Sequence, residues 1–285
     1  MSLADQEPRS SCCWVRESGK RRDDHTQCVR EEKAIVAEKA YDIPQELIER
    51  LRAAQRIAVL TGAGVSAESG IPTFRDAQTG LWAKYHPEDL ATPEAFARNP
   101  RLVWEWYSQR RAQVTQVAPN PGHLALATLE RFVPMVTIIT QNVDGLHQQA
   151  GSTRVIELHG NIRQVKCSVE GNIVETWEET ETPPPLCPLC HGLLRPDVVW
   201  FGELLPEEAF RAATEATAAC DVFFSIGTSG QVYPAASLID LARRCGATVV
   251  VINPDEEAQA TRSFYRLHGP AGKVLPELLE AVWGG

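Results

Sequence analysis

Short apolar runs alternate with longer amphipathic segments from about residue 44 onward. The runs are rich in Val and Ile, which is typical of strands buried in a parallel sheet. They lie at 57–60, 135–140, 155–158, 221–226 and 247–252. Helical patterns are found at 43–53, 93–115, 122–132, 234–243 and 274–283. This alternation predicts an α/β fold with a doubly wound parallel sheet of the Rossmann type.

Two stretches interrupt the alternation. The region after residue 76 reads as loop and helix where a dinucleotide-binding fold usually has its second strand. Residues 162–200 carry a Cys-x-x-Cys pair and a loop rich in Glu, Thr and Pro. We expect a small domain made of a helical module and a zinc-ribbon-like module, packed together beside the sheet. Its insertions are expected at about 77–119 and 162–200, and the Rossmann core at about 44–76, 120–161 and 201–285.

Residues 1–40 differ from the rest of the chain. They are highly charged and have no sustained apolar period, which predicts a disordered tail before a single folded domain at 41–285. The alternative is a mitochondrial transit peptide. Such peptides are poor in acidic residues, whereas this segment has eight acidic and eight basic residues.

Composition narrows the function classes. A net charge of −9 argues against general nucleic-acid binding. The sequence has neither an apolar run that would span a bilayer nor a signal-peptide core, so we expect a soluble cytoplasmic protein without a membrane partner. Its eight cysteines are irregularly spaced and do not resemble a secreted disulfide framework.

A glycine-rich loop directly follows the first predicted strand. Gly62, Gly64 and Ala67 fit the Gly-x-Gly-x-x-Ala form of the dinucleotide fingerprint. Glycines there permit a tight turn and let backbone N–H groups approach a pyrophosphate. The loop runs on into Ser-Gly-Ile-Pro-Thr-Phe-Arg at 69–75, which simple dinucleotide binding does not need. This extension favours a reactive site over a mere nucleotide-binding site.

Further polar clusters follow the other predicted strands, at 141–147, 159–160 and 227–229, with Asn253 after the last strand. Because strand-end loops of an open parallel sheet converge, we expect one shared site in a cleft over the carboxyl ends of the strands. Asn142 and Asp144 are able to hydrogen-bond ribose and carboxamide groups. A histidine such as His159 suits general base catalysis because its pKa lies near neutral pH.

The ordered motifs GAGVSAESGIPTFR (62–75), QNVDGLH (141–147), ELHG (157–160), VVWFGE (198–203) and IGTS (226–229) resemble those of the sirtuins, NAD-dependent protein-lysine deacylases. The resemblance covers about residues 44–283. Tyr107-Ser-Gln-Arg110 is similar to the Tyr-x-x-Arg of class III sirtuins, which remove succinyl, malonyl and glutaryl groups. Arg110 would bind a distal acyl carboxylate bidentately, Tyr107 would add a third hydrogen bond, and the small Ala91 would leave room for the longer acyl group.

The resemblance implies a reaction and a set of site residues. NAD+ would be the co-substrate, acyl-lysine proteins or peptides the partners, and nicotinamide and 2′-O-acyl-ADP-ribose the products, with succinyl or malonyl preferred and some deacetylation. His159 would be the general base, with Asn142 and Asp144 as further catalytic residues. Cofactor-binding residues would be Gly62, Ala63, Gly64, Ser66, Ala67, Ile71, Phe74, Arg75, Gln141, Asn142, Asp144, Gly227, Thr228, Ser229, Asn253, Asp255 and Ala271. Substrate-binding residues would be Tyr107, Arg110, Ala91, Val199, Phe201, Gly202, Glu203 and Val232. His147 is expected only to pack or hydrogen-bond.

The metal site departs from the family pattern. Sirtuins usually carry two Cys-x-x-Cys pairs that bind structural Zn²⁺. Here Cys187 and Cys190 form one pair, but Cys167 is followed three residues later by Glu170. Two alternatives follow. The three cysteines bind zinc more weakly with Glu170 or water as the fourth ligand, or the module folds without metal.

Two other functions remain as alternatives. The first keeps the NAD site but changes the acceptor, giving a mono-ADP-ribosyltransferase or an NAD hydrolase. The second is a non-catalytic, NAD-sensing module that binds acyl-lysine. A pure binding module does not need a general base, so His159 favours an enzyme. We expect the protein to act as a monomer.

Overall fold

The computed structural model describes residues 41–71, 90–178, 182–254 and 259–284. In this part of the chain, seven strands form one sheet in the order β3-β2-β1-β6-β7-β9-β8. All neighbouring pairs are parallel except β8 and β9. The strands are β1 (Arg56–Thr61), β2 (Met135–Thr140), β3 (Val155–Glu157), β6 (Val222–Ile226), β7 (Thr248–Asn253), β8 (Gln259–Thr261) and β9 (Phe264–His268). The predicted fold class is confirmed.

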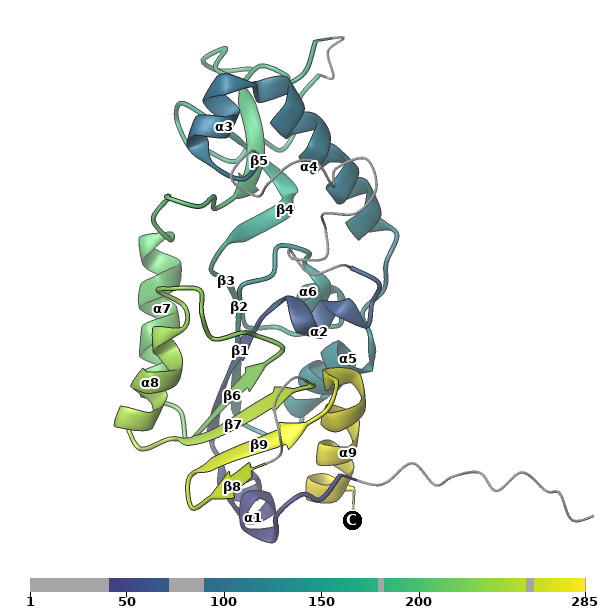
Figure 1. Ribbon diagram of the computed structural model, residues 1–285, viewed down its shortest axis with the longest axis vertical. Coiled ribbons are helices and arrows are strands. Elements are labelled where there is room, and N and C mark those ends of the chain that lie inside the picture. The colour runs from purple at the N-terminus through teal and green to yellow at the C-terminus, as the bar shows by residue number, and fades with distance from the viewer. Residues whose placement is uncertain (1–40, 72–89, 179–181, 255–258, 285) are drawn as a thin grey trace, which may run out of the picture. The chain divides into compact units, whose positions relative to one another are not determined.

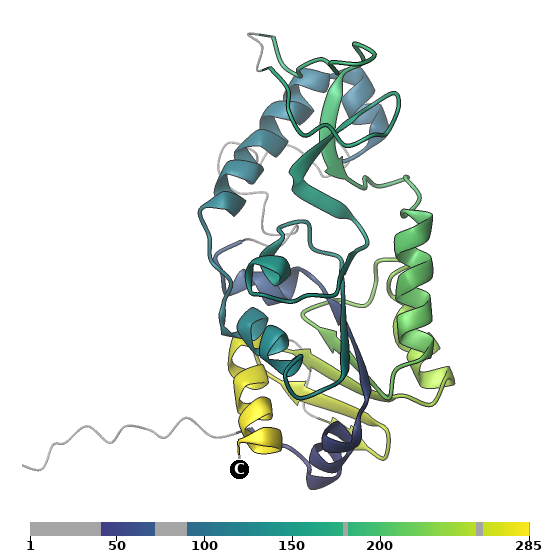
Figure 2. The same ribbon diagram turned by 180° about the vertical axis from the view of Figure 1, so that it is seen from behind.

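Helices cover both faces of the sheet, as Figures 1 and 2 show. Alternate residues of one strand point to opposite faces, so Val59 packs into one hydrophobic core and Leu60 into the other. The first core lies beneath α1 (Gln45–Ala53), α5 (Pro121–Leu129) and α9 (Ala271–Trp283), and the second beneath α7 (Glu207–Ala218) and α8 (Ser237–Arg244). Burial on both faces explains why the strands are apolar throughout.

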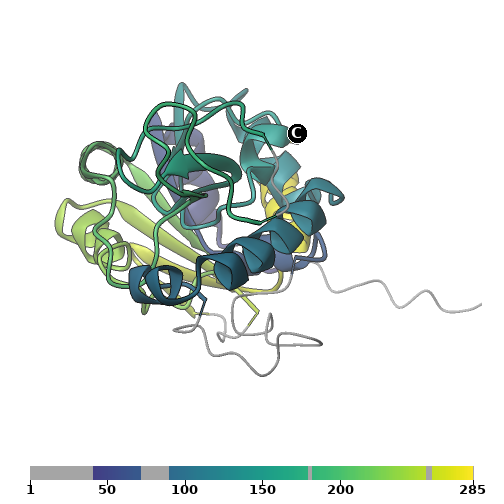
Figure 3. The same cartoon turned by 90° about the horizontal axis from the view of Figure 1, so that it is seen from above.

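The two predicted insertions pack against one another at one end of the sheet and its covering helices (Figures 1 and 3). The first contains α3 (Pro93–Arg98) and α4 (Pro100–Thr115). The second contains the antiparallel pair β4 (Gly160–Cys167) and β5 (Leu194–Val198). Buried side chains of α4, β4 and β5 share a hydrophobic cluster, and the Arg111 Nε donates to the carbonyl of Ile162 at 2.8 Å.

Several elements differ from the sequence prediction. The helix predicted at 93–115 is two helices, because Pro100 begins α4 and the Asn99 side chain caps it by accepting from the Leu102 N–H. The strands β8 and β9 and the helix α7 were not predicted. All three β8 residues are exposed, so that strand has no buried face and no apolar alternation to reveal it.

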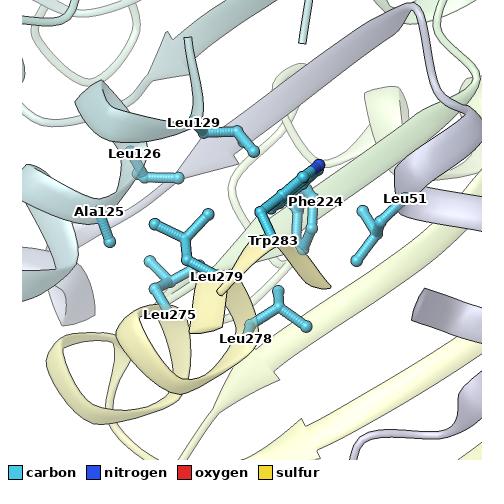
Figure 4. A pocket seen from close by; sticks show the side chains of 9 residues that line it. All are labelled: Leu51, Ala125, Leu126, Leu129, Phe224, Leu275, Leu278, Leu279 and Trp283. Atoms are coloured by element: carbon cyan, nitrogen blue, oxygen red, sulfur yellow. The ribbon is translucent and has the colours of Figure 1, made fainter. Parts of the chain in front are cut away.

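Nine residues line a small cavity between α1, α5, α9 and β6 (Figure 4). They are Leu51, Ala125, Leu126, Leu129, Phe224, Leu275, Leu278, Leu279 and Trp283. All but the indole N–H of Trp283 is apolar, so this cavity is a packing gap in the core and not a site for polar chemistry. None of the helices in the described residues is long and apolar enough to cross a bilayer.

Candidate active site

The order of the strands reverses at β1, because β2 and β6 lie on either side of it. Thr61 at the end of β1 is in register with Thr140 of β2 and Ile226 of β6. The loops that follow these three strands therefore leave the sheet side by side. Such a reversal point is where open α/β sheets bind ligands.

The glycine-rich loop begins α2 (Ala63–Ala67) and packs directly on the loop after β6. A Cβ atom on Gly62 would lie 2.7 Å from the Gly227 carbonyl oxygen, and one on Gly64 would lie 2.8 Å from the Gly227 Cα. The N–H groups of Gly62 and Gly64 donate to the carbonyls of Ile226 and Gly227 at 3.0 and 2.8 Å. The predicted tight turn is present, but these two glycines serve the contact between loops, and their N–H groups are already bonded within the protein.

Asn142 is held in a defined orientation just beyond β2. Its backbone N–H donates to the Thr140 Oγ1 at 3.0 Å, and its Nδ2 donates to the Gly62 carbonyl and to the Ser66 Oγ, both at 3.0 Å. The side chain is 8% exposed. With both amide hydrogens engaged, the Oδ1 acceptor is the part of this side chain left for a ligand.

Asp144 is buried beside Asn142 and shares Ser66 with it. The Ser66 hydroxyl donates to the Asp144 Oδ2 at 2.7 Å, and the backbone N–H of Leu146 donates to Oδ1 at 2.9 Å. The Nε of Arg163 donates to the Asp144 backbone carbonyl at 2.9 Å and so holds the loop from β4. The structure thus brings together three of the predicted residues, Ser66, Asn142 and Asp144, in one hydrogen-bonded group.

His159 lies between β3 and β4, and its Nδ1 is 2.9 Å from the backbone carbonyl of Gln141. A carbonyl only accepts, so Nδ1 carries the hydrogen, and in the neutral ring Nε2 has the free lone pair. Burial lowers the pKa of His159, while the bond to Gln141 opposes this shift. The imidazole is therefore neutral near pH 7, with a basic nitrogen in a known position, as a general base requires.

Hydroxyl and amide groups line the neighbouring strand ends. The Gln141 Nε2 donates to the Thr228 Oγ1 at 3.1 Å, and the Asn253 Nδ2 donates to the Thr228 carbonyl at 3.4 Å. Ser229 is exposed, and its Oγ accepts from the Gln231 N–H at 3.4 Å. These groups form a second polar cluster at the ends of β6 and β7.

Tyr107 and Arg110, the two residues predicted to bind an acidic acyl group, both lie on α4. Tyr107 is 3% exposed and shares a hydrophobic cluster with Ala91. The Arg110 Cζ lies 4.9 Å from the centre of the Trp106 ring. No hydrogen bond or ion pair joins Arg110 to another of the described residues, and burial lowers its pKa. An incompletely paired, partly buried guanidinium of this kind favours an anionic ligand.

The segment after β5 contacts both His159 and Ala91. The Val199 N–H donates to the His159 carbonyl and the Phe201 N–H to the Ala91 carbonyl, both at 2.9 Å. Phe201 is 52% exposed, and Val232, after β6, is 42% exposed. Exposed apolar side chains on these two segments suit contact with a polypeptide substrate.

The Sir2 family model matches residues 62–234 of this chain. The chain belongs to the Sir2 family. It is 52% identical over 81% of its length to NAD-dependent protein deacylase 2 of Pyrobaculum aerophilum, covering 93% of that protein. It is 53% identical over 80% of its length to the NAD-dependent protein deacylase of Ralstonia nicotianae, again covering 93%. A crystal structure of a Sir2 homolog–NAD complex superimposes with a TM-score of 0.77 at 44% identity, covering 85% of this chain and 95% of that one.

The polar groups of this Sir2-family site fit NAD+ chemically. Ribose hydroxyls both donate and accept, and phosphates and a carboxamide need donors and acceptors at fixed positions. Hydroxyls and amides of Ser66, Asn142, Thr228, Ser229 and Asn253 supply these groups at the carboxyl ends of four parallel strands. Three residues predicted to bind NAD+, Phe74, Arg75 and Asp255, lie outside the described residues.

The sulfurs of Cys167, Cys187 and Cys190 lie within 4.8 Å of one another. Tetrahedral zinc with Zn–S bonds near 2.3 Å sets its sulfurs about 3.8 Å apart, so the three thiols fit a structural zinc ion. Backbone N–H groups of Val169 and Glu170 donate to the Cys167 Sγ, each at 3.4 Å, and lower its pKa. Within the described residues the Glu170 carboxylate is outside this group, so the structure does not support Glu170 as the fourth ligand.

Behind Asn142 and Asp144, two buried histidines pack together. The ring centres of His123 and His147 lie 4.8 Å apart. The His147 Nε2 is 2.9 Å from the Thr61 Oγ1, which fits the expected hydrogen-bonding role. His123 Nδ1 accepts from the Asn120 N–H at 3.4 Å. Burial lowers the pKa of His123 to about 4 and that of His147 to about 3.

These shifts predict acid-sensitive stability. Both histidines stay neutral in the folded protein but take up protons in the unfolded chain below about pH 6.5. The unfolded state then binds more protons, so the free energy of unfolding should fall as the pH drops from 7 towards 4, by up to about 1.4 kcal/mol per pH unit for each histidine. Urea unfolding at several pH values measures this slope.

The matched comparison is His147→Gln, which removes one titrating ring. Its slope of unfolding free energy against pH should be smaller by up to about 1.4 kcal/mol per unit between pH 6 and 4. An unchanged slope in the His147 variant would mean that this ring does not resist protonation in the folded state.

Sequence reasoning missed several residues that position the site. Thr140 and Arg163 hold the loop 141–147 through the bonds to Asn142 and Asp144. Trp200 contacts Tyr107, and Arg195 forms an ion pair with Glu203. Of Thr140, Arg163, Trp200 and Arg195, only Trp200 lies inside one of the family motifs, VVWFGE at 198–203. The others make contacts that depend on the tertiary fold, so no local pattern marked them.

Proposed function

We propose that this chain is an NAD-dependent protein deacylase that prefers succinyl- and malonyl-lysine and also removes acetyl groups. The Sir2 family and the activity of its relatives support the general reaction. The observation that carries the proposal is the state of His159, whose Nδ1 donates to Gln141 and whose Nε2 is the free base. A pure binding module has no need of such a group.

His159 is the proposed general base of the reaction. When bound, NAD+ supplies the ribose carbon that the acyl-lysine carbonyl oxygen attacks as nicotinamide leaves. The Nε2 of His159 accepts a proton from a ribose hydroxyl, and the bond from Nδ1 to the Gln141 carbonyl stabilises the imidazolium that results. Asn142 and Asp144, oriented by Ser66, would hold the ribose and the carboxamide.

The proposed acidic-acyl preference depends on Arg110 and Tyr107. Residues three apart on a helix share one face, so both side chains of α4 are able to reach a single carboxylate. Arg110 has no carboxylate partner among the described residues, and the phenol of Tyr107 stays neutral because burial raises its pKa. The small Ala91, 4% exposed in the same cluster, would leave room for the longer acyl group.

The remaining assignments extend the proposal. The substrate peptide would pair its backbone with the segments that carry Val199, Phe201 and Gly202 on one side and Val232 on the other. Glu203 already bonds Arg195 at 2.6 and 2.9 Å, so its part would be to hold this segment in place. Ala63, Ala67, Ile71 and Ala271 would line the nucleotide site, and the insertions would act as a small domain beside the Rossmann core. We propose a cytoplasmic monomer that acts on acyl-lysine proteins.

One panel of peptides tests the proposal. Peptides of a single sequence carrying succinyl-, malonyl-, glutaryl- or acetyl-lysine are mixed with NAD+, and the products are identified by mass spectrometry. We expect nicotinamide and O-acyl-ADP-ribose from acetyl- and succinyl-lysine, with the higher kcat/KM for succinyl- and malonyl-lysine.

Each contrary result would overturn a different part of the proposed function. No nicotinamide release with any peptide would reject the enzyme. ADP-ribose attached to protein without acyl transfer would point to a transferase. Equal or higher kcat/KM on acetyl-lysine would reject the acidic-acyl preference and leave the deacylase intact.

A further inference from the structure

The indole of Trp200 is joined to the phenol of Tyr107. The Trp200 Nε1 lies 3.1 Å from the Tyr107 Oη, and each residue is only 3% exposed. The two residues are 93 positions apart in the chain, and the bond ties helix α4 to the segment after β5. Other aromatic rings also pack on this pair, because Phe96 contacts Trp200 and Trp106 contacts Tyr107. Filling space is therefore not the only role of the contact between Trp200 and Tyr107.

The direction of this bond follows from the chemistry of the two groups. An indole N–H only donates, whereas a phenol both donates and accepts. The Tyr107 oxygen is therefore the acceptor, and its own hydrogen is not used in the bond to Trp200. No other hydrogen bond of Tyr107 is found among the described residues. Donation to a phenol oxygen also polarises its O–H group and makes it a better donor.

Trp200 is itself held firmly. Its backbone N–H donates to the Glu203 Oε2 at 2.8 Å, and the Arg195 Cζ lies 3.3 Å from the centre of its ring. Arg195 in turn binds both carboxylate oxygens of Glu203, at 2.6 and 2.9 Å. The indole also packs against the ring of Phe96, and the two ring centroids lie 5.3 Å apart. These contacts fix the orientation of the indole ring and therefore the direction in which its N–H points.

We propose that Trp200 is a positioning residue for acyl-group selectivity: its indole N–H holds the Tyr107 hydroxyl so that the hydroxyl proton is donated to the distal carboxylate of an acidic acyl group. Arg110, three residues along the same helix face, supplies the charge for that carboxylate. Trp200 does not touch the acyl group and acts through Tyr107. This inference rests on the proposed acidic-acyl function.

A double-mutant cycle tests the proposal. Trp200→Phe keeps an aromatic ring and removes the N–H, and Tyr107→Phe removes the hydroxyl. For both single variants we expect KM for a succinyl-lysine peptide to rise about fivefold, which corresponds to one hydrogen bond of about 1 kcal/mol. The ratio of succinyl to acetyl kcat/KM, measured on peptides of the same sequence, should fall in both variants, because an acetyl group has no distal carboxylate. The double variant should match Tyr107→Phe alone, because the indole N–H then has no hydroxyl to hold.

Trp104→Phe is the matched control. Trp104 lies on α4 and, like Trp200, is 3% exposed, but it belongs to the hydrophobic cluster around Cys167. Its substitution should leave the ratio of succinyl to acetyl activity unchanged. If Trp200→Phe fails to fold, benzothienylalanine at position 200, which replaces the N–H by sulfur in the same outline, makes the same test.

The outcomes separate the inference from the proposed function. A selective loss in Tyr107→Phe without one in Trp200→Phe would overturn the role of Trp200 alone. Equal losses on both peptides in Trp200→Phe, or additive losses in the double variant, would also overturn it. An unchanged succinyl to acetyl ratio in Tyr107→Phe would reject Tyr107 as a carboxylate-binding residue, and the role of Trp200 with it.

Discussion

Replacing His159 with alanine is expected to lower kcat for deacylation by about 10²- to 10⁴-fold, the usual contribution of a positioned general base. The imidazole Nε2 is the free base in this site, because Nδ1 donates to the Gln141 carbonyl. NAD+ binding should change little, since the hydroxyl and amide groups proposed to hold it lie on other loops. Single-turnover mass spectrometry measures the chemical step, and calorimetry measures NAD+ binding.

His159→Asn is the sharper companion variant. An asparagine amide offers an N–H for the Gln141 carbonyl but has no nitrogen that titrates near neutral pH. If His159 acts as a base, the asparagine and alanine variants should be equally impaired. Recovery of activity with asparagine would show instead that the residue mainly holds the loop at Gln141.

Replacing Arg110 with methionine is expected to lower kcat/KM for the succinyl-lysine peptide by about 10- to 150-fold. This range corresponds to the loss of a charged hydrogen bond of about 1.5–3 kcal/mol. Methionine keeps an unbranched side chain over Trp106 but cannot bind a carboxylate. Activity on the acetyl-lysine peptide should fall much less, because acetyl has no distal carboxylate. Steady-state kinetics on the two peptides make the comparison.

Arg111→Met is the matched control for this prediction. Arg111 is the next residue of the same helix, and its guanidinium bonds the Ile162 carbonyl and lies 5.5 Å from the centre of the Trp104 ring. Its loss should reduce stability and affect both peptides alike. If Arg110→Met also lowers both activities equally, Arg110 supports the fold and does not select the acyl group.

Much of the sheet could be predicted from the sequence because burial on both faces leaves a continuous apolar run. The runs at 135–140 and 221–226 fall on β2 and β6 within one residue. Helix boundaries were harder where capping residues decide them, as Asn99 and Pro100 do between α3 and α4. The edge strand β8 has only exposed residues, so hydrophobicity carried no signal there.

The sequence by itself determined the fold class, the family and the chemical types of the site residues. Glycine loops, buried strands and family motifs are local patterns formed by residues adjacent in the chain. Only the tertiary structure decided how these groups are used. It directs the N–H groups of Gly62 and Gly64 to another loop, and it leaves the Glu170 carboxylate out of the thiol cluster. It also selects the tautomer of His159 and joins Trp200 to Tyr107. These features depend on atoms that are distant along the chain and meet only when the sheet and its insertions pack.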